Sequence, residues 1–177
     1  MTSLDAFIQN YFLYSRTPQV TELFFALTTI FDFTVYFILI VAGLSFLINK
    51  TRGGRYSVLF VFSIVASGLV VYLLKEVFST ARPPDGFMHA FGSSFPSYHA
   101  TISTVFFVLL MYIFDDYLSK FSRVVFNTFS IVTLFLVALL RVYLVVYWVS
   151  DVVFGVILGA TLSYVFVSVF RSRNTAL

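Results

Sequence analysis

The sequence contains no cysteine, only two histidines and few charged residues. Without cysteine the chain can form neither disulfides nor thiolate metal sites, and it gives no indication of a redox compartment. Charged residues make up 11% of the 177 residues, less than half of the roughly 25% found in soluble domains. Hydrophobic residues make up 60%, and 24 residues are phenylalanine. This shortage of charge beside so much apolar surface indicates a membrane protein.

Five apolar runs have the length expected of membrane spans. A helix needs about 20 residues to cross a hydrocarbon core of roughly 30 Å. The runs cover residues 33–49, 56–74, 100–114, 124–140 and 152–170. We therefore predict an all-α integral membrane protein with a five-helix transmembrane bundle over residues 31–171 and a short tail over residues 172–177. Because no repeat or linker interrupts the chain, residues 1–177 are expected to form a single domain.

The first thirty residues carry polar side chains at short intervals, such as Asp5, Arg16 and Glu22. Their order differs from the basic-then-apolar order of a secretory signal peptide, so we expect no cleaved leader. Apolar residues recur at helical spacing, but Pro18 interrupts them and no run reaches spanning length. Residues 1–30 are therefore predicted to form two short helices that lie at the membrane surface.

Basic residues gather in segments that follow alternate spans, and short loops rich in Lys and Arg usually face the cytoplasm. The residues are Lys50, Arg52, Arg55, Lys120, Arg123, Arg171 and Arg173. We predict that these segments and the C-terminus are cytoplasmic, and that the N-terminal segment, the 79–96 loop and the 144–150 turn face outward. The net charge of +3 is then a signal of topology and gives no reason to expect a nucleic-acid partner.

Four further basic residues fall on the outward side, and three of them, all but Arg16, need another account. Lys75 and Arg141 lie near the outer ends of the second and fourth spans, and Arg82 follows shortly after the second span. A charge costs about 2–3 kcal/mol at full membrane depth, so it usually has a partner or a purpose. Each of the three could snorkel or form a structural ion pair, such as Arg141 with Asp151. Together on one face, without an acidic cluster, they favour a site for an anion such as phosphate.

Three short motifs on this face resemble those of a known enzyme family. "KEVFSTARP" has the pattern K-x6-R-P at residues 75–83, and "PSYH" has P-S-x-H at residues 96–99. "RVYLVVYWVSD" has R-x9-D at residues 141–151. In this order and spacing the motifs resemble the type 2 phosphatidic acid phosphatase family, whose sites are related to those of vanadium-dependent haloperoxidases. The resemblance covers roughly residues 75–171.

The resemblance implies roles for the residues of these motifs. A phosphate is expected at the N-terminus of the third span, where the Ser97 hydroxyl and nearby amides would hold its oxygens. His99 is expected to protonate the departing lipid oxygen. The resemblance implies neither a metal nor another cofactor. The residues expected to bind the phosphate are Lys75, Arg82, Ser97, Tyr98 and Arg141.

The third motif departs from the family pattern at Tyr147. The family has R-x5-H-x3-D there, and its histidine attacks phosphorus while the aspartate, here Asp151, orients the ring. A phenol has a pKa near 10 and is a poor nucleophile unless cations or a base activate it. A phosphotyrosine ester is also less labile than a phosphohistidine. We interpret Tyr147 either as a slow catalytic nucleophile or as an interfacial aromatic paired with Trp148.

Two other positions call for comment. Tyr98 stands where the family usually has glycine, and we interpret it as a pocket wall that contacts substrate or, equally, as a solvent-facing aromatic. His89 matches no family position, and we interpret it as structural.

The sequence thus predicts a phosphatase-like protein that binds a phosphorylated or pyrophosphorylated lipid at the outer membrane face. Glycerophospholipids and isoprenoid carriers are both open as ligands, as are the oligomeric state and whether Tyr147 supports dephosphorylation. A second hypothesis is a catalytically silent protein that binds lipid phosphates with the same residues. A transporter fits less well, because the charges lie at one face and the spans lack Gly/Pro-interrupted pairs. The resemblance to small bacterial members predicts the bacterial inner membrane.

Overall fold

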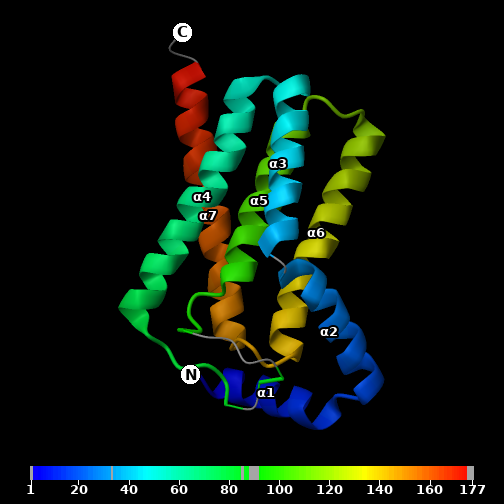
Figure 1. Ribbon diagram of the computed structural model, residues 1–177, viewed down its shortest axis with the longest axis vertical. Helices are drawn as coiled ribbons and strands as arrows, with labels where there is room; N and C mark the ends of the chain where they lie inside the picture. The colour runs from blue at the N-terminus through cyan, green and yellow to red at the C-terminus, as the bar shows by residue number, and fades with distance from the viewer. Residues whose placement is uncertain (1, 33, 85, 88–91, 175–177) are drawn as a thin grey trace.

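The computed structural model describes residues 2–32, 34–84, 86–87 and 92–174, and this part of the chain contains seven helices. The helices are α1 (Ser3–Ser15), α2 (Pro18–Asp32), α3 (Thr34–Thr51), α4 (Gly54–Phe78), α5 (Tyr98–Phe114), α6 (Lys120–Tyr143) and α7 (Val149–Asn174). The bounds of α3 to α7 lie close to those of the five apolar runs in the sequence. In Figure 1, α3 to α7 run along the long axis and α1 crosses one end of the bundle. The α3–α4 turn and the C-terminus lie at the opposite end.

Helices occupy all five of the segments in which we expected membrane spans. Three of them, Gly54–Phe78, Lys120–Tyr143 and Val149–Ser172, are long and apolar enough to cross a membrane. The apolar helices Val35–Thr51 and Tyr98–Phe114 are shorter than these three. The all-α architecture is therefore confirmed, and the count of five spans stays a prediction.

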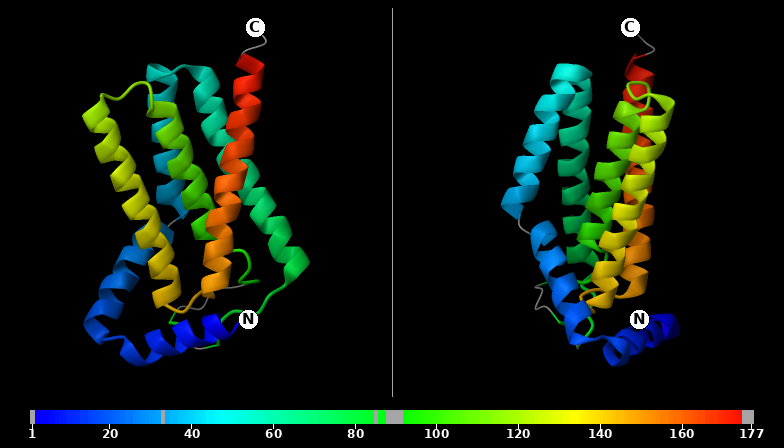
Figure 2. Two further views of the ribbon diagram at one scale, coloured as in Figure 1. Left: turned by 180° about the vertical axis from the view of Figure 1, so that it is seen from behind. Right: turned by 90° about the vertical axis from the view of Figure 1, so that its right-hand side faces the viewer.

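The N-terminal segment forms two helices, divided where Pro18 begins α2. Proline fits the first position of a helix because its missing N–H would have no intrahelical partner there. At the start of α1, the Thr2 hydroxyl accepts from the Asp5 amide at 3.1 Å, and the Asp5 carboxylate accepts from the Thr2 amide at 2.8 Å. Figure 2 shows α1 lying across the end of the bundle in both views. The place of these helices at the membrane surface stays a prediction.

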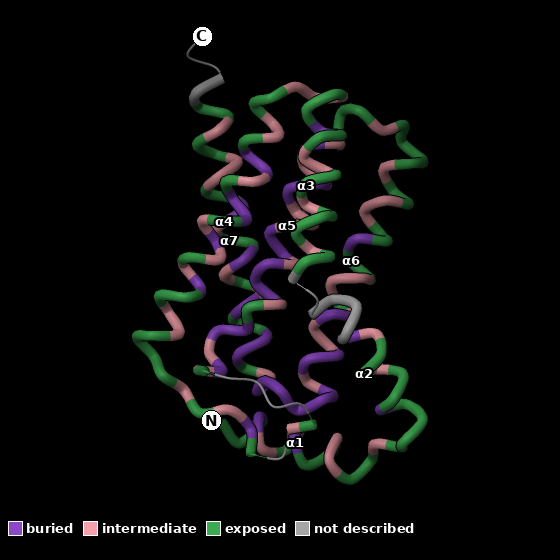
Figure 3. The backbone as a smooth tube through the Cα atoms, viewed as in Figure 1, coloured by how far each residue is buried: buried purple, intermediate pink, exposed green. Residues whose placement is uncertain are grey.

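The bundle packs around α5, which contacts α4, α6 and α7. Buried segments run along α5, whereas α3 and α4 carry many exposed positions (Figure 3). Many of the exposed side chains are large and apolar, among them Val65, Phe135 and Tyr164. Apolar side chains that face outward along helices of spanning length are suited to contact with lipid hydrocarbon.

Two glycines of α7 allow it to approach α5 closely. A Cβ at Gly155 would lie 2.9 Å from the Ser97 carbonyl oxygen, and one at Gly159 would lie 2.6 Å from the Thr101 carbonyl oxygen. Small residues spaced four apart let two membrane helices bring their backbones together. The pair therefore fixes the start of α5 against the start of α7, which is where two of the sequence motifs lie.

Candidate active site

The three motifs meet at the end of the bundle that α1 covers, because α4 ends there, α5 begins there, and a tight turn there joins α6 to α7. In that turn Val145 has a φ of 55°, a left-handed conformation that is costly for a β-branched residue. This conformation lets the amides of Val146 and Tyr147 return to the Arg141 carbonyl oxygen at 3.2 and 3.4 Å. The backbone is strained where the chain presents Tyr147.

The Tyr147 side chain lies against the two cations of the first motif. The Lys75 Nζ is 5.4 Å from the centroid of its ring, and the Arg82 Cζ is 4.6 Å from the same centroid. Both distances are within the range of cation–π attraction. Tyr147 and Trp148 are only 5% and 7% exposed. This burial does not fit the interpretation of the pair as an aromatic anchor at the membrane interface.

Lys75 also binds the end of the loop that leads into α5. Its Nζ donates to the Ser93 carbonyl oxygen at 2.6 Å and to the Ser94 carbonyl oxygen at 3.3 Å. An ammonium group has three donors, so one remains for another acceptor. The lysine therefore holds the loop in place and still has a donor that could bind an anion.

Arg82 makes a wider set of hydrogen bonds to the backbone. Its Nε donates to Gly92 at 3.0 Å, its Nη2 to Ser93 at 3.3 Å and its Nη1 to Val146 at 3.1 Å, in each case to the carbonyl oxygen. It thereby joins the loop before α5 to the turn before α7. The Trp148 indole strengthens this connection, since its Nε1 donates to the Ala81 carbonyl oxygen at 2.9 Å.

Asp151 and Ser97 bring the starts of α7 and α5 together. The Asp151 carboxylate accepts from the Trp148 amide at 3.1 Å, and its backbone carbonyl accepts from the Ser97 amide at 3.1 Å. Ser97 is the N-cap of α5, with its hydroxyl accepting from the Ala100 amide at 3.4 Å. Both Asp151 and Ser97 are buried. The starts of α5 and α7 therefore meet beside the cations. The partial positive charge of the α5 start favours an anion, whereas the Asp151 carboxylate already accepts from the start of α7.

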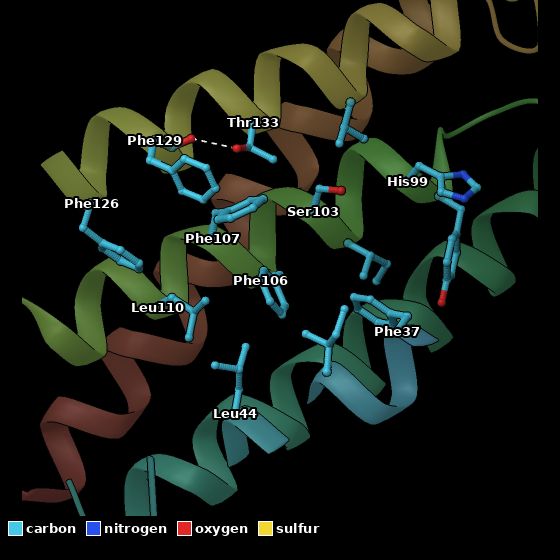
Figure 4. Close-up of a pocket in the computed structure, with 14 residues that line it drawn as sticks. Phe37, Leu44, His99, Ser103, Phe106, Phe107, Leu110, Phe126, Phe129 and Thr133 are labelled. Carbon is cyan, nitrogen blue, oxygen red and sulfur yellow. Dashed lines mark hydrogen bonds between the residues drawn. The ribbon is translucent and has the colours of Figure 1, made fainter. Parts of the chain in front are cut away.

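His99 and Tyr98 lie in the first turn of α5. Their rings pack edge to face, with the ring centroids 5.8 Å apart. Both line a cavity of about 430 Å³ between α3, α5 and α6. In Figure 4, His99 lies at one end of this cavity and Phe126 at the other, with Phe106 and Phe107 between them. Tyr98 is 40% exposed, so it has the position of a pocket wall with one side open.

The structure thus brings Lys75, Arg82 and Tyr147 into direct contact and places Asp151 and Ser97 at the adjoining helix starts. Arg141 joins this group through its backbone carbonyl, and its own side chain is buried at the end of α6. His89 lies outside the described residues. Within the described ranges, no group of three His, Cys, Asp or Glu residues is placed to hold a metal ion.

Two parts of the site had no signal in the sequence. The carbonyl groups of Gly92, Ser93 and Ser94 are backbone acceptors, so their residue types do not reveal them. Asp5 was assigned to a surface helix, but it is 1% exposed, and it accepts from the Ser150 amide at 2.9 Å and from the Ser150 hydroxyl at 3.0 Å. The acid therefore caps α7 beside Asp151. The sequence shows Asp5 only as an acidic residue near the start of an amphipathic segment, which does not reveal a partner in α7.

The order of the motifs and their meeting at one end of the bundle agree with a match over residues 56–175 to the model of the PAP2 superfamily. The chain belongs to the PAP2 superfamily. This confirms the resemblance at the level of the family. No curated protein matches the sequence significantly.

Two solved structures have a similar fold. The crystal structure described as the first transmembrane PAP2 type phosphatidylglycerolphosphate phosphatase from Bacillus subtilis matches with a TM-score of 0.86 and 22% identity. The match covers 96% of this chain and 86% of that one. Aquifex aeolicus LpxE matches with a TM-score of 0.71 and 19% identity, over 93% of each chain. The family and the apolar helices together identify an integral membrane protein with a lipid-phosphatase fold.

Proposed function

We propose that this protein binds a lipid phosphate at the outward face of a bacterial inner membrane, and that Tyr147 limits its hydrolysis to a slow rate. The observation that carries the proposal is that Lys75 and Arg82 adjoin the Tyr147 ring, where two buried helix starts meet. The outward orientation rests on the distribution of Lys and Arg, which gather at the other end of the bundle.

The cavity beside His99 supports a lipid as the ligand. Its walls are almost entirely apolar and include Phe37, Phe106 and Phe129 from three different helices. Such walls suit a hydrocarbon chain, because burying apolar surface there removes it from water. With the phosphate beside Lys75 and Arg82 and the chain in this cavity, the ester oxygen would lie near His99. The proposed substrate class is therefore a phosphomonoester or pyrophosphate of a lipid.

The proposed reaction has two steps. The Tyr147 oxygen attacks phosphorus, and the bond to the lipid oxygen breaks while His99 supplies the proton for that oxygen. Water then cleaves the phosphotyrosine ester and releases inorganic phosphate. Lys75 and Arg82 beside the ring stabilise the negative charge of the reacting phosphate, and the phenol proton passes to water as the bond to phosphorus forms. The second step is the slow one, because a phosphate ester of tyrosine is less reactive than a phosphohistidine.

The test is phosphate release from a panel of lipid phosphates by the unaltered protein and by the variant Tyr147→His. We expect the variant to be at least about a hundredfold faster, which is the lower range for a positioned catalytic group. The electrostatic surroundings of the reacting phosphate are kept in this variant, and only the attacking atom changes. Tyr147→Phe is the matched control, and it should bind vanadate as the unaltered protein does.

Two outcomes would change the proposal in different directions. If Tyr147→His folds and binds vanadate but releases no phosphate, the protein is a lipid-phosphate binder without catalytic function. If the unaltered protein is fast, Tyr147→Phe is inactive and mass spectrometry finds phosphate on Tyr147, then the tyrosine is an efficient nucleophile and the predicted slow second step is wrong.

A further inference from the structure

A second pocket lies at the opposite end of the bundle, far from Tyr147. It has a volume of about 290 Å³ and lies where α3 ends, α4 begins and α7 ends. Figure 1 shows these three helix ends at the same end of the molecule as the C-terminus. Six residues line the pocket: Arg52, Gly53, Gly54, Arg55, Tyr56 and Phe170. It is therefore a polar pocket with two arginines and an aromatic wall.

Arg52 is held in this pocket with part of its hydrogen-bonding capacity unused. Its guanidinium lies over the Tyr56 ring at 5.1 Å, and its side chain is 18% exposed. The Nη2 is 3.9 Å from the Asp116 carboxylate, which is too long for a hydrogen bond. The buried Nε has no acceptor among the residues that the structure describes. A buried donor without an acceptor costs about 1–3 kcal/mol, but this Nε is enclosed, so a ligand in the pocket would bind the other guanidinium nitrogens of Arg52.

The backbone beside Arg52 adds further donors. Gly53 is the N-cap of α4 with a φ of 94°, a conformation that suits glycine, and it offers no side-chain acceptor to the first amides of the helix. The first turn of α4, including Gly54 and Arg55, lines the pocket. Amides at a helix start together with arginine donors form a site suited to a phosphate group.

We propose that this pocket binds the phosphate of an anionic phospholipid headgroup from the leaflet at this end of the bundle. The pocket lies at the start of α4 and near the end of α7, and both helices are of spanning length. A pocket at the ends of spanning helices is at the depth of the headgroups. Basic pockets between transmembrane helices are suited to such headgroups. The Tyr56 and Phe170 rings, 5.0 Å apart, give the apolar wall that the start of an acyl chain would contact.

The distribution of basic residues by topology does not by itself explain this pocket. Lys50 and Lys120 lie at the same end and are exposed, as a charge that only sets orientation can be. Arg52 instead has a mostly buried side chain, with its Nε in contact with no solvent. The proposal also does not depend on the lipid-phosphatase site, because no residue of the pocket belongs to the three motifs.

The test measures the melting temperature of purified protein in neutral detergent with added phosphatidylglycerol, phosphatidylcholine of the same chains, or inorganic phosphate. All arms use the Arg82→Gln background, so that an anion at the Tyr147 end does not contribute. We expect phosphatidylglycerol alone to raise the melting temperature. Equal effects of the two lipids, or an equal effect of inorganic phosphate, would overturn the proposal, and neither result requires a pocket variant to fold.

A pair of double variants then locates the effect. In Arg52→Gln/Arg55→Gln the apparent affinity for phosphatidylglycerol should fall at least about tenfold, since charge-assisted hydrogen bonds are lost. The control Lys50→Gln/Lys120→Gln removes the same charge from the same end outside the pocket and should change the affinity less than about threefold. Equal losses in both double variants would show general attraction to the anionic headgroup and contradict a built site.

Discussion

Tyr147 is the residue at which the third motif is predicted to depart from the family pattern. Its ring contacts two cations, and these cations give several of their hydrogen bonds to backbone carbonyls of the loop and turn around it. Lys75 and Arg82 therefore hold the loop that leads into α5, and in the proposed function they also bind the phosphate. An arginine with this role is not replaceable by lysine, because a single ammonium cannot reach the three carbonyls that the planar guanidinium joins.

At the residue scale, the motifs predicted one site from six basic, polar and acidic side chains, and contacts join Lys75 and Arg82 to Tyr147, while His99 and Tyr98 line the adjoining cavity. Lys75, Arg82 and Asp151 were expected at one face from their spacing and from the ends of the spans. The spacing could not show which groups Lys75 and Arg82 donate hydrogen bonds to, because the acceptors are backbone carbonyls in an irregular loop and a turn. The buried carboxylate of Asp5 was also not predicted as part of the site, because it lies more than 140 residues from Ser150, its partner, in the sequence.

Asp5 gives a prediction about pH. Burial alone raises the pKa of its carboxyl, but hydrogen bonds from Thr2 and Ser150 outweigh burial and hold the pKa below its usual value. These bonds stabilise the charged form, so their contribution is present above the unfolded pKa of about 3.9 and is lost as the pH falls through the lower folded value. We expect Asp5→Asn to melt below the unaltered protein at pH 7, by an amount equivalent to about 1–2 kcal/mol.

The measurement is the melting temperature of both proteins between pH 7 and pH 3. The difference between them should be constant down to about pH 4 and should shrink at lower pH. A difference that stays the same down to pH 3 would show that the charge of Asp5 has no part in capping α7. Thr161→Ala is a control that removes an exposed hydroxyl in the same helix, and its effect should not depend on pH.

At the element scale, the contact between α5 and α7 determines whether the motifs meet. Gly155 and Gly159 have the spacing of the small-residue pairs through which membrane helices pack. Both helices were predicted from their apolar runs, but hydrophobic periodicity carries no information on which two spans approach most closely, so the contact at these glycines was not predicted. The boundaries of all five bundle helices were nevertheless predicted within a few residues, because a long apolar run in a membrane protein forms a helix, which satisfies its backbone hydrogen bonds internally.

The glycine contact predicts a contrast between two substitutions. In Gly159→Ala the added Cβ would lie 2.6 Å from a backbone carbonyl oxygen and 2.7 Å from the Thr104 Cβ, so α7 must move away from α5. Overpacking of this kind costs about 1–3 kcal/mol, and the melting temperature should fall. Gly43→Ala, in α3, meets no atom within 4 Å and should leave the melting temperature unchanged or raise it. A Gly159→Ala protein as stable as Gly43→Ala would contradict the close packing of α5 on α7.

At the scale of the whole molecule, the two ends of the bundle are predicted to face opposite sides of the membrane. α1 lies at one end and the start of α6 lies at the other (Figure 2). Because the chain has no cysteine, single cysteines can be labelled without a background. The exposed residues Tyr14, on α1, and Phe121, on α6, are suitable positions.

With a membrane-impermeant maleimide on intact cells, we expect Tyr14→Cys to be labelled and Phe121→Cys to be labelled only after the membrane is opened. The reverse result would place the lipid-phosphatase site on the cytoplasmic side. In the five-span topology, three spans, α3, α4 and α5, lie between Tyr14 and Phe121, so the two positions face opposite sides of the membrane. Labelling of both variants in intact cells would contradict this topology.

The central claim is that the Lys75–Arg82 pair beside Tyr147 binds the phosphate of a lipid. Its most direct test is the melting temperature with a lipid phosphate, compared with the same lipid without its phosphate, for the unaltered protein and for Arg82→Gln. At a hundred times the dissociation constant, the phosphate should raise the melting temperature of the unaltered protein by about 5 °C or more. Every sample contains saturating phosphatidylglycerol, which fills the proposed pocket at the opposite end. Under this condition Arg82→Gln should lose most of the rise, while Lys120→Gln, exposed at the opposite end and outside that pocket, should keep it. A rise of the same size in Arg82→Gln, or none in the unaltered protein, would contradict the claim.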